Sequence, residues 1–180
     1  LGLLGFGRIG RAVCRRALGF GLTVLACDPR VDAGTASRRG ARLAGFEELL
    51  AGSDIVSLHC NLGADNQGLL NRDVFARMLR KPLLLNVARG ALIVEADLVE
   101  ALDRGLIAGA ALDVLTQESP DLSQHPLAGR RDVLLTPHVA FYSEAALDDL
   151  RRISAQNVRV FHEGRPQEVF RLVAPEESAA

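Results

Sequence analysis

Short apolar runs alternate with amphipathic stretches along most of the chain. The apolar runs, which we predict to be strands, cover residues 1–4, 22–27, 54–58, 82–87, 107–112 and 133–135. Helical spacing of apolar positions predicts helices over residues 8–18, 46–51, 72–78, 95–104 and 143–162. Residues 31–45 are polar and weakly periodic, and predict a loop with room for one short helix. Strands that are apolar on both faces and alternate with helices predict a doubly wound α/β fold with a parallel sheet.

The first predicted strand runs directly into Gly5-Phe6-Gly7-Arg8-Ile9-Gly10, which opens the first predicted helix. Gly5 permits a sharp turn, Gly7 lets a pyrophosphate approach the backbone, and Gly10 lets the helix pack closely. The N–H groups and the dipole at the helix N-terminus favour an anion. We therefore predict a dinucleotide site. The alternative is a structural turn, since a chain with 17 glycines produces such turns by chance.

An acidic residue, Asp28, directly follows the second predicted strand. A carboxylate at this place accepts hydrogen bonds from an adenosine ribose and repels a 2′-phosphate. This arrangement predicts NAD rather than NADP as the cofactor. Arg8 and Arg30 are placed to reach a cofactor phosphate or ribose, and Arg30 leaves tolerance of a 2′-phosphate open.

Length and charge narrow the class of protein. A chain of 180 residues is the size of one domain with one core. Its 21 basic and 22 acidic residues give a net charge of −1, so we expect no nucleic-acid partner and no membrane partner. No run has metal-ligand spacing, so we predict no metal. The three cysteines lack C-x-x-C spacing and predict reduced thiols in a cytoplasmic protein. Leu1 already lies in a predicted strand, and we expect further residues before it.

Chemically active side chains follow the later strands, at the sheet edge where doubly wound folds bind ligands. Arg89 offers a planar fork of donors for a carboxylate, and His138 can exchange a proton near neutral pH. Glu118 is able to orient the imidazole and favour its protonated form. The alternatives are a solvated arginine, a structural histidine and a plain loop acid. For His59 we favour packing or hydrogen bonding beside the cofactor over catalysis.

Four motifs resemble, in their order, the cofactor domain of the NAD-dependent D-2-hydroxyacid dehydrogenases. They are the glycine turn, Leu85-Asn86-Val87-Ala88-Arg89-Gly90, Ala110-Ala111-Leu112-Asp113-Val114 with Glu118 beyond it, and Thr136-Pro137-His138. The resemblance covers roughly residues 1–165. Residues 57–62 and 141–144 are also similar to the C-terminal-binding-protein branch, whose members act as transcriptional corepressors.

The resemblance implies an oxidoreductase that interconverts a D-2-hydroxy acid and a 2-oxo acid by hydride transfer, with NAD as cofactor. Arg89 would bind the substrate carboxylate, and His138 paired with Glu118 would be the acid/base. Asp113 would hold the nicotinamide carboxamide. The implied cofactor-binding residues are Gly5, Gly7, Arg8, Ile9, Gly10, Asp28, Cys60, Asn61, Val87, Ala88, Asp113 and His138. A homodimer formed mainly through this domain is also implied.

The chain departs from the family pattern around Glu118 and in its extent. Ser119 stands where the family usually has proline, which leaves the geometry of this loop open. Glutamate at position 118, with Gln117 one residue out of register, argues against the formate dehydrogenase branch. We expect residues 1–163 to form the dinucleotide-binding domain. We expect residues 164–180 to be a C-terminal tail that returns toward a substrate domain whose N-terminal part is missing here.

Three other functions stay open on sequence grounds. They are an NAD(H)-sensing, corepressor-like interaction module, a related dehydrogenase of another small anion such as phosphite, and a purely structural α/β domain. The sequence does not identify the 2-hydroxy acid, because the side chains that discriminate substrates would come mostly from the missing domain.

Overall fold

A computed structural model describes residues 1–170 of the chain. The chain forms two compact units, Leu1–Ala140 and a second that begins at Phe141. This division differs from the boundary after residue 163 that the sequence suggested. The role of residues 164–180 as a tail of a substrate domain stays a prediction, and residues 171–180 lie outside the described part.

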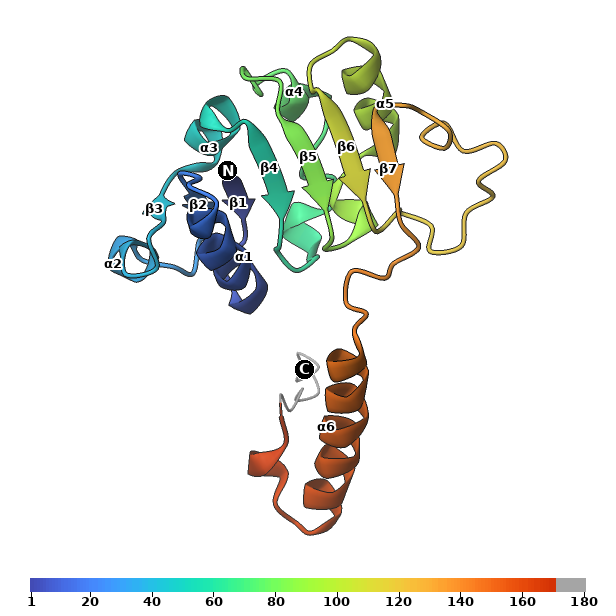
Figure 1. Cartoon of the computed structure of the whole chain (residues 1–180). Coiled ribbons are helices and arrows are strands. Elements are labelled where there is room, and N and C mark those ends of the chain that lie inside the picture. The colour runs from blue at the N-terminus through green and yellow to red at the C-terminus, as the bar shows by residue number, and fades with distance from the viewer. Residues whose placement is uncertain (171–180) are drawn as a thin grey trace, which may run out of the picture. The chain divides into compact units, whose positions relative to one another are not determined.

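The first unit is built on one parallel sheet of seven strands in the order β3-β2-β1-β4-β5-β6-β7 (Figure 1). The strands are β1 (Gly2–Leu4), β2 (Leu25–Cys27), β3 (Arg42–Leu43), β4 (Ile55–Leu58), β5 (Leu83–Asn86), β6 (Gly109–Leu112) and β7 (Val133–Leu135). Every neighbouring pair is parallel. The predicted doubly wound, Rossmann-like α/β fold is confirmed.

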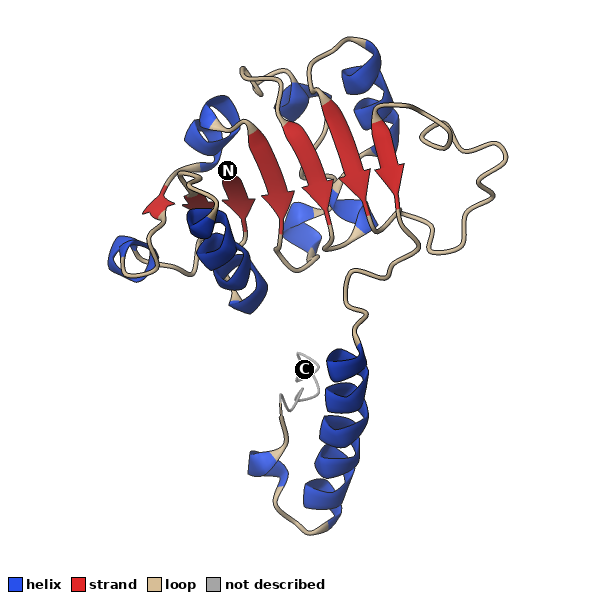
Figure 2. Cartoon of the chain, viewed as in Figure 1, coloured by secondary structure: helices blue, strands red, loops and turns tan. Residues whose placement is uncertain are grey.

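Helices lie in each connection from β1 to β6, whereas a long loop without a helix joins β6 to β7. Parallel neighbours need such long crossover connections. The α-helices are α1 (Arg8–Gly19), α2 (Ala33–Ser37), α3 (Phe46–Gly52), α4 (Arg72–Phe75), α5 (Glu95–Asp103) and α6 (Glu144–His162) (Figure 2). Residues 1–170 also form three short 3₁₀ helices, η1 (Ala64–Asn66), η2 (Gly90–Leu92) and η3 (Pro166–Glu168).

Successive side chains of the strands pack alternately into two separate apolar cores, one on each face of the sheet. Leu3 of β1 and Ala26 of β2 belong to a small core with Phe6 and Cys14 of the first β–α unit. Leu4, one residue further along β1, belongs to the larger core that α3, α4 and α5 cover. Because successive side chains of a strand point to opposite faces, this division fixes the register of the sheet.

Strands β2 and β6 begin at residues 25 and 109 instead of 22 and 107, and two further segments differ from the sequence expectation. The segment 31–45 contains the short helix α2 and also strand β3, whose two residues pair with Leu25 and Ala26 of β2. So short and polar an edge strand carries no alternation that a sequence pattern can detect. Helix α4 ends at Phe75 instead of residue 78, because the chain turns there and passes through Lys81 at φ 50° before it enters β5.

The second unit begins with the predicted long helix. The Ser143 hydroxyl caps α6 by accepting the N–H of Ala146 at 3.1 Å, as the sequence predicts for a serine at this position. Within residues 1–170, no helix is long and apolar enough to cross a lipid bilayer.

Candidate active site

The strand order reverses beside β1, whose neighbours are β2 on one side and β4 on the other. Connections leave β1 and β4 toward opposite sides of such a sheet, which opens a crevice at their carboxyl ends. The residues that the sequence singled out follow these ends and the ends of β5, β6 and β7. Topology therefore places the candidate residues along one edge of the sheet.

The glycine turn joins β1 to α1 without any side-chain cap. Gly5 has φ +96°, a left-handed conformation that favours glycine, and its N–H donates to the Cys27 carbonyl oxygen at 2.9 Å. Gly7 is the N-cap of α1, and the first turn holds no acidic residue. The amides of this turn thus keep the positive end of the helix dipole for an external anion.

Gly7 and Gly10 differ in their surroundings. A Cβ on Gly10 would overlap the carbonyl oxygen of Gly5, so the helix is packed against the turn itself. A Cβ on Gly7 would meet no atom within 4 Å. Gly10 is therefore required for packing, whereas Gly7 leaves open space in front of the helix N-terminus.

Asp28, at the end of β2, is tied to this turn. Its Oδ2 accepts the N–H of Phe6 at 2.8 Å, and its Oδ1 accepts the N–H of Arg30 at 2.9 Å. The carboxylate is thus fixed beside the glycine turn. Each oxygen keeps a further lone pair with which it can accept a ligand hydroxyl.

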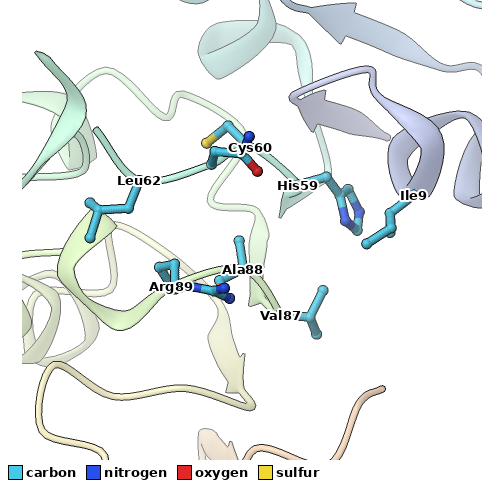
Figure 3. A pocket seen from close by; sticks show the side chains of 8 residues that line it. Ile9, His59, Cys60, Leu62, Val87, Ala88 and Arg89 are labelled. Atoms are coloured by element: carbon cyan, nitrogen blue, oxygen red, sulfur yellow. The ribbon is translucent and has the colours of Figure 1, made fainter. Parts of the chain in front are cut away.

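A pocket of about 300 Å³ lies at the ends of β4 and β5 and the start of α1. Figure 3 shows that Ile9 enters the pocket from α1, that one set of lining residues (His59 to Leu62) follows β4, and that another (Val87 to Arg89) follows β5. Its lining residues are Ile9, His59, Cys60, Asn61, Leu62, Val87, Ala88 and Arg89. The structure therefore brings together six of the predicted site residues with His59, which we expected beside the cofactor, and with Leu62, which the sequence did not single out.

The ionisable groups after β4 are kept neutral. Burial lowers the pKa of His59, whose Nε2 lies 3.0 Å from the Ser57 hydroxyl. Burial also raises the pKa of the Cys60 thiol, and the neighbouring charge of Asp28 adds to this effect. The wall of the pocket at this side is therefore uncharged at neutral pH.

Asn86 shapes the turn that carries Arg89. This fully buried side chain accepts the N–H of Ala88 at 3.0 Å and donates to the carbonyl oxygen of Arg89 at 2.9 Å. The exposed Arg89 guanidinium donates to the Ala88 carbonyl oxygen through Nη1 at 2.7 Å. The sequence showed Asn86 only as part of a motif. An amide side chain at the end of an otherwise apolar predicted strand was the available signal for a positioning role.

Asp113, at the end of β6, holds the turn that presents His138. Its carboxylate accepts the Thr136 hydroxyl at 2.5 Å and the N–H groups of Val139 and Ala140 at 2.9 and 2.8 Å. Its backbone carbonyl oxygen accepts the N–H of His138 at 2.9 Å. His138 has φ 53°, which is unusual for a residue with a side chain, and its imidazole is exposed. The contacts from Asp113 stabilise this left-handed conformation.

The same contacts keep Asp113 ionised. Burial alone would raise the pKa of Asp113, but the hydrogen bonds from Thr136, Ala140 and Val139 outweigh it and hold the pKa below its usual range. A positive charge on His138 lowers the pKa further. Asp113 is thus an anion at neutral pH beside the candidate acid/base.

Glu118 lies in the loop between β6 and β7 and is exposed. Its pairing with His138 stays a prediction. Among residues 1–170, no group of three or more His, Cys, Asp or Glu side chains is arranged to hold a metal ion. All three cysteines are free.

Residues 1–140 match the model of the D-isomer specific 2-hydroxyacid dehydrogenase family, NAD binding domain. The chain belongs to this family. The match spans the whole sheet and the glycine turn, and it confirms the resemblance seen in the four sequence motifs. It also confirms that these residues form an NAD-binding domain.

Relatives of this chain within the D-2-hydroxyacid dehydrogenase family carry the names of three different dehydrogenases or reductases. A hydroxypyruvate reductase from Blautia hydrogenotrophica is 36% identical over 169 residues, which are 94% of this chain and 52% of the relative. A D-3-phosphoglycerate dehydrogenase from Bacillus subtilis is 41% identical over 170 residues, 92% of this chain and 31% of the relative. The crystal structure of D-lactate dehydrogenase with NAD+ from Lactobacillus jensenii has a TM-score of 0.86 and 30% identity, covering 97% of this chain and 55% of that one. The chain thus spans about half or less of these relatives.

The residues present fit NAD. The open space at Gly7 lets a pyrophosphate reach the amides of α1, and the anchored Asp28 carboxylate lies where an adenosine ribose would need an acceptor. Ile9, Val87 and Ala88 give the pocket apolar walls for a flat ring.

Proposed function

We propose that the protein to which this chain belongs interconverts a D-2-hydroxy acid and the corresponding 2-oxo acid by hydride transfer. The observation that carries this proposal is that Arg89 lines the same pocket as Ile9 from the first turn of α1. A carboxylate-binding fork thereby lies next to the place where the cofactor is expected. When bound, NAD(H) supplies or accepts the hydride at C2 of the substrate.

The chain's own residues then do three things. Arg89 binds the substrate carboxylate and polarises the adjacent carbonyl, which orients C2 toward the cofactor. His138 gives its proton to the carbonyl oxygen during reduction and takes the hydroxyl proton during oxidation. Glu118 accepts a hydrogen bond from the imidazole and favours its protonated form.

Asp113 has two roles in this proposal. Its carboxylate holds the turn at residues 136–140, and the remaining lone pair of Oδ2 would accept the nicotinamide carboxamide. Gly5, Gly7, Arg8, Ile9, Gly10 and Asp28 would contact the adenosine and pyrophosphate side, and Cys60, Asn61, Val87, Ala88 and His138 the nicotinamide side.

We further propose a cytoplasmic homodimer with no nucleic-acid or membrane partner. The near-zero net charge supports the absence of such partners. Leu150, Val158 and Phe161 of α6 are exposed apolar side chains that a partner subunit would cover. None of the three relatives described above is a corepressor or a phosphite dehydrogenase, so those alternatives gain no support.

Titration of the full-length protein with NADH and NADPH, followed by nicotinamide fluorescence, tests the cofactor assignment. We expect NADH to bind at least about tenfold more tightly than NADPH, because the Asp28 carboxylate repels a 2′-phosphate. Asp28→Asn should reduce this preference, whereas the matched control Asp54→Asn, which changes a surface ion pair with Arg80, should keep it. Equal binding of both cofactors by the wild-type protein would contradict the assignment of Asp28.

A screen of 2-oxo acids with NADH, and of D- and L-2-hydroxy acids with NAD, tests the reaction. We expect turnover of at least one 2-oxo acid and oxidation of D-isomers only. Turnover restricted to phosphite, or NADH binding without any turnover, would overturn the proposed reaction while leaving the cofactor site intact.

A further inference from the structure

The Glu95 side chain extends from the start of α5 to the long loop that joins β6 to β7. Its Oε1 accepts the N–H of Thr116 at 2.6 Å, across 21 positions of sequence. A hydrogen bond from a backbone N–H to a carboxylate is stronger than one between neutral groups. Neither the family motifs nor the proposed chemistry uses Glu95.

The second oxygen of Glu95 holds the other limb of the same loop. Its Oε2 lies 3.3 Å from Nε2 of His125, and the two side chains are only 23% and 13% exposed. The Nδ1 of His125 accepts the N–H of Leu127, so the neutral ring carries its hydrogen on Nε2, the nitrogen that faces Glu95. One carboxylate therefore binds both limbs of the loop, at Thr116 and at His125.

A close backbone contact fixes the same part of the loop from another side. A Cβ on Gly90 would overlap the carbonyl carbon of Leu115 and the nitrogen of Thr116. The peptide between Leu115 and Thr116, whose N–H donates to Glu95, thus packs directly against the turn that begins at Arg89. Glu118 follows this peptide by two residues.

We propose that Glu95 is a positioning residue: through Thr116 and His125 it fixes the loop that carries Glu118 against the Arg89–Gly90 turn. This inference rests on the proposed function, in which Arg89 binds the substrate and Glu118 orients His138. Glu95 itself touches neither the substrate nor the cofactor in this arrangement. Loss of its carboxylate releases the loop and leaves the glycine turn and Asp28 unchanged.

The test compares Glu95→Ala, Glu95→Gln and Glu100→Ala in the full-length protein, with kcat, KM, the Kd of NADH and amide hydrogen exchange measured for each. Glu100 is the matched control, because it lies on the same helix and pairs with Arg72 and Arg104. For Glu95→Ala we expect kcat to fall roughly 10- to 100-fold and exchange of residues 114–127 to become faster, with the Kd of NADH within about threefold of the wild type. Glu95→Gln keeps an oxygen acceptor and should recover kcat to within about fivefold. Glu100→Ala should match the wild type.

A kcat of Glu95→Ala within twofold of the wild type, or unchanged exchange of residues 114–127, would overturn the positioning role. A parallel loss of NADH affinity would also overturn it, since a general structural defect then accounts for the lost activity. If Glu95→Ala does not fold, His125→Gln is measured in the same way and should lower kcat by a smaller factor, and no change would overturn the role. A wild-type protein without any turnover would refute the proposed function, and hydrogen exchange would still decide whether Glu95 holds the loop.

Discussion

Asp113 accepts the backbone N–H of His138 at its own carbonyl oxygen, at 2.9 Å, while its carboxylate accepts the N–H groups of the two residues that follow His138. The candidate acid/base is thus held from β6, although it follows β7. A left-handed residue such as His138 persists only where its surroundings stabilise the conformation.

Replacement of Asp113 by asparagine tests this relationship. One carboxylate oxygen becomes an NH2 group, which cannot accept a hydrogen bond, so at least one of the three donors loses its partner. We expect the free energy of unfolding in urea to fall by about 1.5–3 kcal/mol and kcat to fall at least about tenfold. Thr136→Val, which removes only one donor, is the milder control. Wild-type stability and kcat in Asp113→Asn would show that the turn at residues 136–140 keeps its conformation without the carboxylate.

His138→Asn separates chemistry from backbone geometry. Asparagine adopts positive φ more readily than most residues, so the turn should survive while the proton donor is lost. We expect kcat to fall roughly 10²- to 10⁴-fold, a much larger change than that in the Kd of NADH. His162→Asn, at the exposed end of α6, should keep full activity. A variant with more than a tenth of wild-type kcat would exclude His138 as the acid/base.

Gly7→Ala and Gly10→Ala should fail in different ways. The Cβ at position 10 overlaps the backbone of Gly5, so Gly10→Ala should lower the free energy of unfolding by about 3 kcal/mol or more. The Cβ at position 7 meets nothing, so Gly7→Ala should change stability by less than about 1 kcal/mol but raise the Kd of NADH at least tenfold. Urea denaturation and NADH fluorescence measure both quantities. An unchanged Kd of NADH for Gly7→Ala would contradict the assignment of the pyrophosphate site to this turn.

His59 should make stability depend on pH in the mildly acidic range. Burial lowers the pKa of His59 in the folded protein below its unfolded value of about 6.5, so protonation favours the unfolded chain. The contribution of the neutral His59 to the free energy of unfolding is therefore fully present above about pH 6.5, and it is lost as pH falls through the lower pKa of the folded protein. Urea denaturation between about pH 7 and 5 should show a smaller decline for His59→Gln than for the wild type. His162→Gln, which changes an exposed imidazole, should follow the wild-type curve, and an equal decline in all three proteins would contradict the assignment.

The sequence alone determined the elements and motifs whose signals are local. The apolar runs of β1, β4, β5 and β6, the glycines of the turn at residues 5–10 and the serine cap of α6 each act within a few neighbouring residues. Their physical requirements can therefore be read from the pattern itself. The same holds for Asp28, Arg89 and His138, since each lies within three residues of the end of a predicted strand.

Only the tertiary structure decided the contacts that join distant segments. Strand β3 forms because Arg42 and Leu43 pair with the neighbouring strand β2. Two residues are too few to show the alternation of apolar and polar positions that predicts a strand. Glu95 and Asp113 read as an ordinary helix-start acid and a motif residue until the fold brings Thr116, His125 and the His138 turn to their carboxylates. A hydrogen bond across 20 or more residues depends on the topology that places two segments together, and topology is a property of the folded chain as a whole.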